Sequence, residues 1–561
     1  MEKRIFLAIL ISLGVLWGWA ALAPKLFPEL VKKQPPAATS KTAEQKPAPS
    51  STTTATATAA DTAATTSTTP DALTPAPTLT AGTTAAAIAS DREQRTVIDT
   101  PEYTAVLSNR GAQLVSFKLK KYARKKSKEH EDLVKAREPG RTDYPFMIVP
   151  RDRALLKLNS AFYVLSETQV NGQRVLQYRY SDGRLTATKT FRFAQQPYLF
   201  DFSIDVHPPS PYRIAVGPGI RTLAAEEQDT QVITTGNAVY QAEGKFKILQ
   251  REKVPTVKAV PSVEFIGVED NYFLTAVRPQ RSGEGVFQRV RFVDAKNKKH
   301  RDDVYAGLNA TSEGVVVGQA FFGPKETALL DRYNMQAALQ FGWFDLIARF
   351  FLKALIWLNQ YTLNYGFAII VLTILIKIVL YPLQHKSIVS MKKMQKVQPK
   401  VEAIKAKYKK SKTDAEQRQK MNVEMMALYQ KEGINPMAGC LPLILQLPIL
   451  WGFYNLLSRA IELRGAPWIL WIHDLSDKDP TYILPILMTA TMFIQTYITP
   501  TTGDPAQRKI FLIMPLVFGF LFKDFPSGLV LYWLVQNILT IVQQLIMNKW
   551  WKQHPEEIQK A

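Results

Sequence analysis

A single lysine interrupts one of the longest apolar stretches of this sequence. Lys377 is the only charged residue between positions 361 and 384. A charge at the centre of a membrane costs about 2.5–3.5 kcal/mol on insertion scales. Two interpretations remain open: the ammonium group extends along its aliphatic stem to the nearer membrane surface, or it faces a water-filled cavity together with Thr373, one helical turn earlier.

Polar residues recur in the other apolar stretches. The last stretch carries a stripe at helical spacing that consists of Tyr532, Gln536, Thr540, Gln543 and Gln544. Earlier stretches contribute Gln446, Asn455, Gln495 and Thr496. Such side chains can hydrogen-bond between helices, but that role leaves Lys377 without a partner. A hydrophilic pocket that faces inward accounts for all of them, and its chemistry is recognition of polar groups rather than bond making.

The sequence offers no catalytic or metal-binding constellation. Ser527 has no histidine within the apolar stretches to activate it, and the pair His473-Asp474 has no nucleophile beside it. The single cysteine, Cys440, excludes an internal disulfide and a multi-cysteine metal site, and no histidine pair has ligand spacing. We therefore expect no cofactor, no metal and no enzyme activity. A solute transporter remains an alternative, although the span interiors lack the acidic residues of ion-coupled transport.

The elements that must position these residues are six predicted membrane spans. The first follows Lys3 and Arg4 and lies within residues 1–31; it resembles a cleavable signal, but its length and Pro24 favour an uncleaved anchor. The others lie at 359–384 and, within 434–549, at 434–458, 481–500, 509–525 and 527–549. We expect a polytopic α-helical membrane protein.

Charge sets the expected orientation. The loop 385–432 holds 13 Lys and Arg against 5 Asp and Glu, whereas the loop 461–480 holds 2 against 4. The positive-inside rule places the first loop and both termini in the cytoplasm. Residues 91–340 then lie on the opposite side.

The segment before the second span divides into a linker and a β domain. Residues 32–90 are almost entirely Ala, Thr, Pro and Ser, which predicts a disordered tether. Residues 91–340 show alternation of period two, with hairpin turns at Asn171-Gly172 and Ser181-Asp182-Gly183, which predicts a large all-β sandwich. Its excess of basic residues is dispersed and accompanies no nucleic-acid motif, so we expect a solvated surface and no sequence-specific nucleic-acid binding.

Two amphipathic segments flank the second span. Residues 341–358 place Asp345, Arg349 and Lys353 on one face and aromatic residues around the rest, which predicts a helix in the membrane interface. Residues 385–433 predict a helical hairpin, whose second helix begins at a capping box of Thr413 and Glu416. Its apolar face includes Met391, Met394, Met421 and Met425. The hairpin either binds anionic lipid headgroups as a topology determinant or forms a docking surface for apolar segments or RNA-rich assemblies.

Several ordered motifs point to one family. They are Tyr381-Pro382-Leu383, Met391-Lys392-Lys393-Met394, Gln398-Pro399-Lys400, Gln446-Leu447-Pro448, Trp471-Ile472-His473-Asp474-Leu475 and Phe525-Pro526-Ser527-Gly528-Leu529. Together they resemble the YidC branch of the Oxa/Alb family of membrane protein insertases, in its Gram-negative form with a large periplasmic domain. Asn109-Arg110-Gly111-Ala112 and Phe322-Gly323-Pro324 extend the resemblance more weakly into the β domain.

The resemblance implies a function and a site. It implies an inner-membrane insertase and chaperone whose five-helix core forms a hydrophilic groove for nascent membrane proteins, alone or beside the Sec translocon. Lys377 would attract polar or acidic segments of the substrate, and many relatives have arginine there. Thr373, Tyr532 and Trp533 would lie along the substrate's exit path, with Gln446, Gln495 and Gln536 in the same groove. The hairpin would receive chains from the ribosome or the signal recognition particle pathway, whereas the tail 550–561 is too short to bind ribosomes as long basic tails do.

Overall fold

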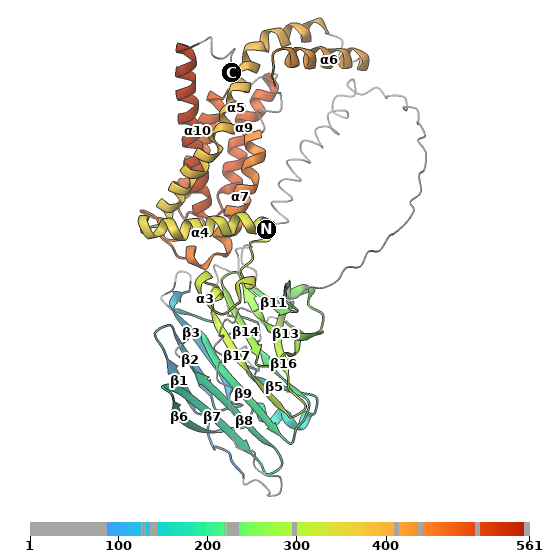
Figure 1. Cartoon of the computed structure of the whole chain (residues 1–561), viewed down its shortest axis with the longest axis vertical. Coiled ribbons are helices and arrows are strands. Elements are labelled where there is room, and N and C mark those ends of the chain that lie inside the picture. Colours follow the sequence, from blue (N-terminus) through green and yellow to red (C-terminus); the bar gives the residue numbers. More distant parts are fainter. Residues whose placement is uncertain are drawn as a thin grey trace, which may run out of the picture.

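The computed structural model describes residues 87–554 apart from 125–126, 128, 135–142, 195, 218, 222–234, 294–299, 409–413, 435–440 and 500–504. The predicted anchor at 1–31, nearly all of the predicted linker and most of the tail lie outside the described residues. In Figure 1 a β-sandwich occupies one end of the molecule and a bundle of helices the other, with helix α4 lying across the bundle between them.

The sandwich is built from two antiparallel sheets. The smaller sheet has the order β1 (Arg95–Asp99), β2 (Tyr103–Ser108), β3 (Gln113–Ala123) and β4 (His130–Asp132). The larger, thirteen-stranded in the described part of the chain, runs β5-β10-β16-β15-β13-β14-β17-β9-β8-β7-β6, with β11 paired to β13 and to β12. Its strands are β5 (Met147–Pro150), β6 (Val164–Val170), β7 (Gln173–Ser181), β8 (Thr186–Phe193), β9 (Leu199–His207), β10 (Tyr212–Val216), β11 (Thr235–Ala242), β12 (Lys245–Leu249), β13 (Val257–Asp270), β14 (Phe273–Pro279), β15 (Gly283–Val293), β16 (His300–Asn309) and β17 (Val315–Pro324). Short 3-10 helices are η2 (Arg153–Asn159), η3 (Arg251–Lys253), η4 (Gln336–Ala338), η5 (Gly342–Phe344) and η8 (Ile461–Leu463).

Alternation of apolar residues explains the sandwich, because every second side chain of a strand faces the same way. Phe117 on β3 stacks on Tyr103 of β2 at 4.4 Å and meets Phe200 of β9 at 6.3 Å between ring centroids, which joins the two sheets. Both predicted hairpin turns are confirmed. Asn171 and Gly172 have φ of 52° and 74° between β6 and β7, as a tight hairpin requires.

The helical part follows the sandwich, so the predicted fold class is confirmed. Its helices are α3 (Thr327–Arg332), α4 (Asp345–Thr362), α5 (Tyr365–Lys407), α6 (Ala415–Lys431), α7 (Leu441–Arg459), α8 (Ile483–Ile498), α9 (Pro505–Phe522) and α10 (Ser527–Gln553). Of these, α5 and α10 are long and apolar enough to cross a membrane on their own, and Ile483–Ile498 and Phe511–Phe522 are shorter apolar helices. The number of spans, six, remains a prediction.

Helix α4 continues to Thr362, beyond the predicted end at 358. It ends there because Leu363 adopts a left-handed conformation with φ of 53°. One face of α4 packs against the core through Phe351, Leu352 and Leu355. The other leaves Leu346, Phe350 and Trp357 exposed, beside a fully exposed Trp343. This exposed apolar face suits a membrane interface.

The second span and the first arm of the hairpin are one continuous helix, α5, which runs through the boundary predicted at 384/385. Where the span ends along this helix stays a prediction. Pro382 removes one backbone hydrogen bond, but the turns on either side still continue the helix. The second arm is capped by Asp414, whose carboxylate accepts from Glu416 N at 2.9 Å, rather than by Thr413, which lies outside the described residues.

Candidate functional site

Helix α5 brings Lys377 against α10. The Lys377 Nζ atom donates to Thr540 Oγ1 at 2.9 Å, and Thr540 Oγ1 donates in turn to the Gln536 carbonyl at 2.8 Å. Only 7% of Lys377 is exposed. Thr373 is fully buried one turn away, and its hydroxyl donates to the Ile369 carbonyl at 2.6 Å. The lysine therefore lies between helices, on a hydroxyl group rather than on a carboxylate.

The part of the stripe from Tyr532 to Thr540 faces α5 and α7. Gln446 of α7 donates to the hydroxyl group of Tyr532, and the Tyr532 ring stacks on Phe453 of α7 with centroids 4.6 Å apart. Trp533 is turned toward α9, where its ring meets that of Phe522 edge-on at 5.0 Å. Tyr532 and Trp533, although adjacent in sequence, thus contact different helices.

Helix α8 contacts α10 through Gln544, a member of the predicted stripe, and through Asn537, which the sequence analysis did not select. Asn537 donates to Thr491 Oγ1 at 3.3 Å, and Gln544 donates to Thr499 Oγ1 at 2.9 Å. Gln495 is half-buried on α8, and its carbonyl accepts from Thr499. Asn537 was overlooked because it lies one position beyond Gln536, about 100° around the helix from the stripe. Its polar side chain inside an apolar helix is the sequence signal that could have identified it.

Several buried amides in this region have unused hydrogen-bonding capacity. Among the residues that the structure describes, Gln536 Oε1, both polar atoms of Gln543, and Asn455 Nδ2 are buried without a hydrogen-bond partner. An unsatisfied buried polar group costs about 1–3 kcal/mol. These amides can therefore accept further polar groups. Gln536 and Gln543 lie on the same face of α10 as Thr540, the contact of Lys377, whereas Asn455 lies on α7.

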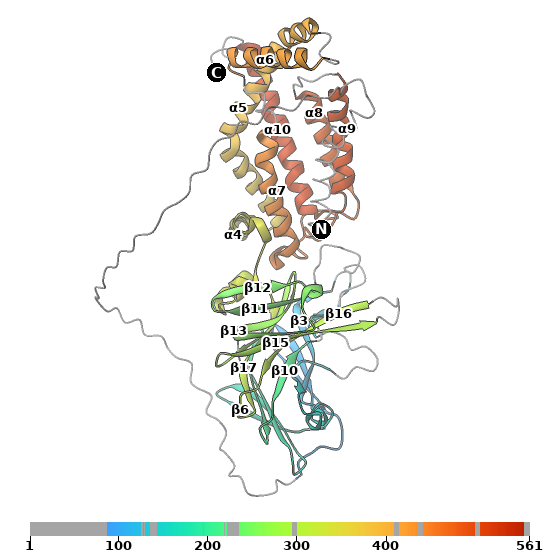
Figure 2. The same cartoon turned by 90° about the vertical axis from the view of Figure 1, so that its right-hand side faces the viewer.

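The predicted docking methionines lie in and beside the hairpin formed by α5 and α6. Met394 is buried with Val397 and Val401 of α5, and Met425 of α6 packs against this cluster. Met391 packs instead against Met547 and Trp551 at the end of α10. Met421 is half-buried on α6. Figure 2 shows the hairpin at the end of the bundle that is farthest from the β-sandwich.

Ion pairs join the two arms of the hairpin. Lys400 bonds Glu432 at 2.6 Å, and Lys407 bonds Glu424 at 3.0 Å. These pairs are exposed and so contribute little to stability. Within the described residues, no cluster of three or more His, Cys, Asp or Glu side chains could hold a metal ion.

Comparisons with known proteins agree over the whole described chain. The family model described as "60Kd inner membrane protein" matches residues 357–555, and that described as "YidC periplasmic domain" matches residues 95–354. Proteins named "Membrane protein insertase YidC" from Maridesulfovibrio salexigens and Geobacter metallireducens are 33% and 32% identical, over 98% of this chain and 99% and 98% of their own. The chain belongs to the YidC family of membrane protein insertases. A YidC insertase from Syntrophus aciditrophicus is 37% identical over 83% of this chain and 87% of its own.

Membership in the YidC family confirms the predicted resemblance and the insertase function. These YidC relatives are named insertases rather than enzymes, and they give no support to the transporter alternative. The match to a family of inner membrane proteins agrees with the membrane-crossing character of α5 and α10.

Proposed function

We propose that this insertase moves nascent membrane proteins into the bilayer through a groove between α5, α7, α8 and α10. The groove is lined by Lys377, Thr373, Gln446, Gln495, Tyr532, Trp533 and Gln536. The observation that supports it best is the set of unpartnered buried amides next to a lysine held between helices. Polar groups at this depth lower the cost of bringing a short hydrophilic segment into the membrane.

Lys377 attracts the polar or acidic segment that precedes a substrate's apolar helix. The bond to Thr540 pairs the ammonium with a hydroxyl group that carries no charge, so a substrate carboxylate is a stronger partner for the ammonium and displaces the hydroxyl group. Tyr532, Trp533 and Thr373 then guide the apolar helix toward lipid. Its burial there supplies the driving force, about 0.8 kcal/mol per methylene group.

Transport from the cytoplasm into the bilayer assigns each surrounding element to one side of the membrane. The α5–α6 hairpin lies on the cytoplasmic side, receives chains from the ribosome or the signal recognition particle pathway, and binds anionic lipids through its lysines. The β-sandwich is periplasmic, α4 lies in the membrane interface, and the spans number six, with both termini cytoplasmic. Some substrates also require the Sec translocon.

Site-specific photo-crosslinking to a stalled nascent chain tests the groove. Gln536 and Ile538 lie two positions apart on α10, so they have similar depth but point in nearly opposite directions, and Ile538 is exposed. A photo-reactive residue at Gln536 is expected to capture a single-span substrate with an acidic leading segment, and one at Ile538 to capture lipid. Equal capture from both positions, or capture from Ile538 alone, would place the substrate path elsewhere.

A further inference from the structure

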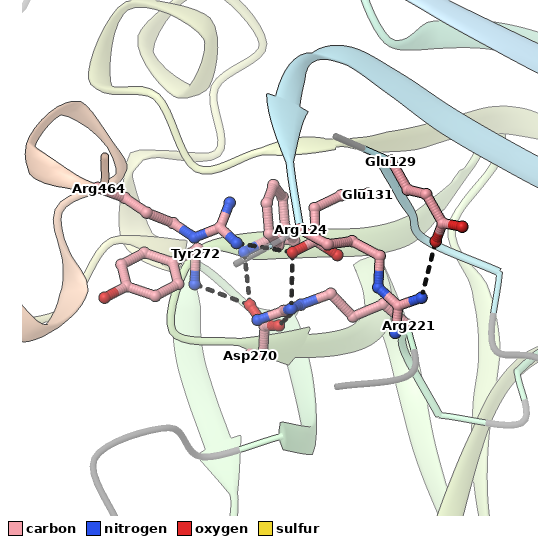
Figure 3. Close-up of polar contacts among 8 residues, drawn as sticks. Arg124, Glu129, Glu131, Arg221, Asp270, Tyr272 and Arg464 are labelled. Atoms are coloured by element: carbon pink, nitrogen blue, oxygen red, sulfur yellow. Dashed lines mark hydrogen bonds and ion pairs between the residues drawn. The ribbon is translucent and has the colours of Figure 1, made fainter. Parts of the chain in front are cut away.

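A group of buried charges joins the β-sandwich to the helical bundle. We call Glu131, Arg221, Asp270 and Arg464 the junction network; Figure 3 shows its contacts. Glu131 on β4 accepts from Arg221 at 3.0 Å and from Arg464 at 2.6 Å, and Arg221 also pairs with Asp270 at 2.5 Å. The side chains of Glu131 and Arg464 are 1% and 6% exposed. The positive charges of two guanidinium groups and the negative charges of two carboxylates thus compensate each other in a site that is shielded from water.

Arg464 reaches this network from the helical bundle. It follows η8 in the connection between α7 and α8, and its guanidinium lies 5.4 Å from the ring centroid of Tyr272. Two further contacts lie at the end of α7 and just after it: Asn271 donates to the Ser458 carbonyl of α7 at 2.9 Å, and Thr327 Oγ1, at the start of α3, donates to Glu462 at 2.8 Å. The end of α7 and the α7–α8 connection are therefore held by the β-sandwich and by α3.

The same connection covers the ends of the two helices that carry the groove. The amides of Ser527 and Gly528, in the first turn of α10, donate to the carbonyls of Asp477 and Leu475 at 2.6 and 2.9 Å. At the start of α5, Asn364 donates to the Trp468 carbonyl at 3.1 Å.

At the start of α5 the contact is close-packed. A Cβ atom added to Gly366 would lie 2.0 Å from the Trp468 ring. The segment from 466 to 482 therefore closes the bundle at the end that faces the β-sandwich.

We propose that Glu131 is a positioning residue for the insertase groove. By holding Arg464 it fixes the α7–α8 connection over the ends of α5 and α10, so that the β-sandwich keeps its end of the groove closed to water. This role rests on the proposed groove, but it concerns the closed state without substrate. Loss of one partner from a buried ion pair leaves the other charge uncompensated, which strongly favours local opening.

Thiol labelling from the side of the β-sandwich tests the closure. Cys440→Ser removes the native thiol, and Gln536→Cys places a reporter in the groove. In reconstituted full-length protein, Glu131→Gln is expected to raise the rate at which a membrane-impermeant thiol reagent labels the reporter by at least about tenfold. The matched control is Glu129→Gln, because Glu129 lies two positions away and pairs with Arg124 at 3.3 Å but is 75% exposed; its labelling rate stays that of the parent.

A second pair of variants separates closure from folding. Glu131→Gln combined with Arg464→Gln leaves Arg221 with Asp270 and restores the charge balance, so its hydrogen exchange in β3 and β4 returns toward the parent. Its groove nonetheless labels fast, because the link to the α7–α8 connection is gone. If Glu131→Gln does not accumulate, Arg464→Lys keeps the charge, loses the planar fork and gives an intermediate rate.

Labelling rates that stay at the parental value in all these variants would overturn the proposal. No substrate is present in this measurement, so a negative crosslinking result at Gln536 would refute the proposed substrate path without affecting the labelling test.

Discussion

The hydrogen bond between Lys377 and Thr540 gives a measurable test of where the Lys377 ammonium group lies. Thr540→Val keeps the shape of the side chain and removes the acceptor. A hydrogen bond to a charged group contributes about 1.5–3 kcal/mol, whereas side-chain bonds between membrane helices average about 0.6 kcal/mol. Because Lys377 is only 7% exposed and thus poorly hydrated, we expect its bond to Thr540 to contribute the larger of these two energies, about 1.5–3 kcal/mol.

A double-mutant cycle isolates this bond from other effects of the substitutions. Thr540→Val, Lys377→Met and the double variant are unfolded reversibly in lipid bicelles, with Thr540→Ser as the control that keeps the hydroxyl group. We expect a coupling energy of at least about 1.5 kcal/mol and near-parental stability for Thr540→Ser. Additivity within about 0.5 kcal/mol would show that Lys377 does not bond Thr540 in the membrane and instead extends to its surface.

Three further predictions concern the sandwich, the closed end of the bundle and the hairpin. Burial lowers the pKa of Lys189 from 10.5 to about 7. Above pH 7 the unfolded chain therefore binds a proton that the folded chain has released, and the free energy of unfolding of the sandwich rises by roughly 2 kcal/mol from pH 7 to pH 9. Denaturation at both pH values checks this, and Lys189→Met has a smaller rise. Gly366→Ala forces the Trp468 ring away from α5 and lowers the free energy of unfolding by about 1–3 kcal/mol. The control is Gly465→Ala, whose added methyl group meets no atom within 4 Å, although the φ of 70° at this position strains it. This control leaves the amides of α5 protected from hydrogen exchange. Asp414→Ala removes the cap of α6 and costs about 1 kcal/mol, seen as faster exchange at the amides of the first turn, and Asp414→Asn retains the cap.

Local patterns were sufficient to predict the elements but not their ends. The alternation around Asn171-Gly172 predicts β6, β7 and the turn between them, because strand period and turn chemistry are properties of neighbouring residues. The continuity of α5 past Gln384 was not foreseen, because hydropathy falls there while helix propensity does not. A change from an apolar to a basic amphipathic sequence marks where the surroundings change, and α5 continues through that change.

Partners across the fold could not be predicted from spacing. Lys377 was recognised as costly without a partner, yet Thr540 lies 163 residues later and was seen only as one member of a stripe. Glu131 and Arg464 are 333 residues apart, and each taken alone is an ordinary surface-type residue. Their pairing depends on how β4 and the α7–α8 connection meet, which no periodicity encodes.

The proposed groove and the junction network differ in how their buried polar groups are paired, and this difference supports the separate roles proposed for them. The junction network pairs each of its buried charges with an opposite charge across two parts of the chain, which makes their separation costly. In the groove, Gln536 and Gln543 retain unpaired polar atoms and Lys377 rests on a neutral hydroxyl group, so the folded state leaves hydrogen-bonding capacity unused. In the proposed mechanism a substrate's polar segment satisfies those amides, and its carboxylate replaces the hydroxyl group at Lys377, so that its binding free energy offsets the cost of leaving water. An insertase that receives many different segments and releases each one to lipid would need polar groups that exchange partners at its groove, together with a firmly held closure beside it.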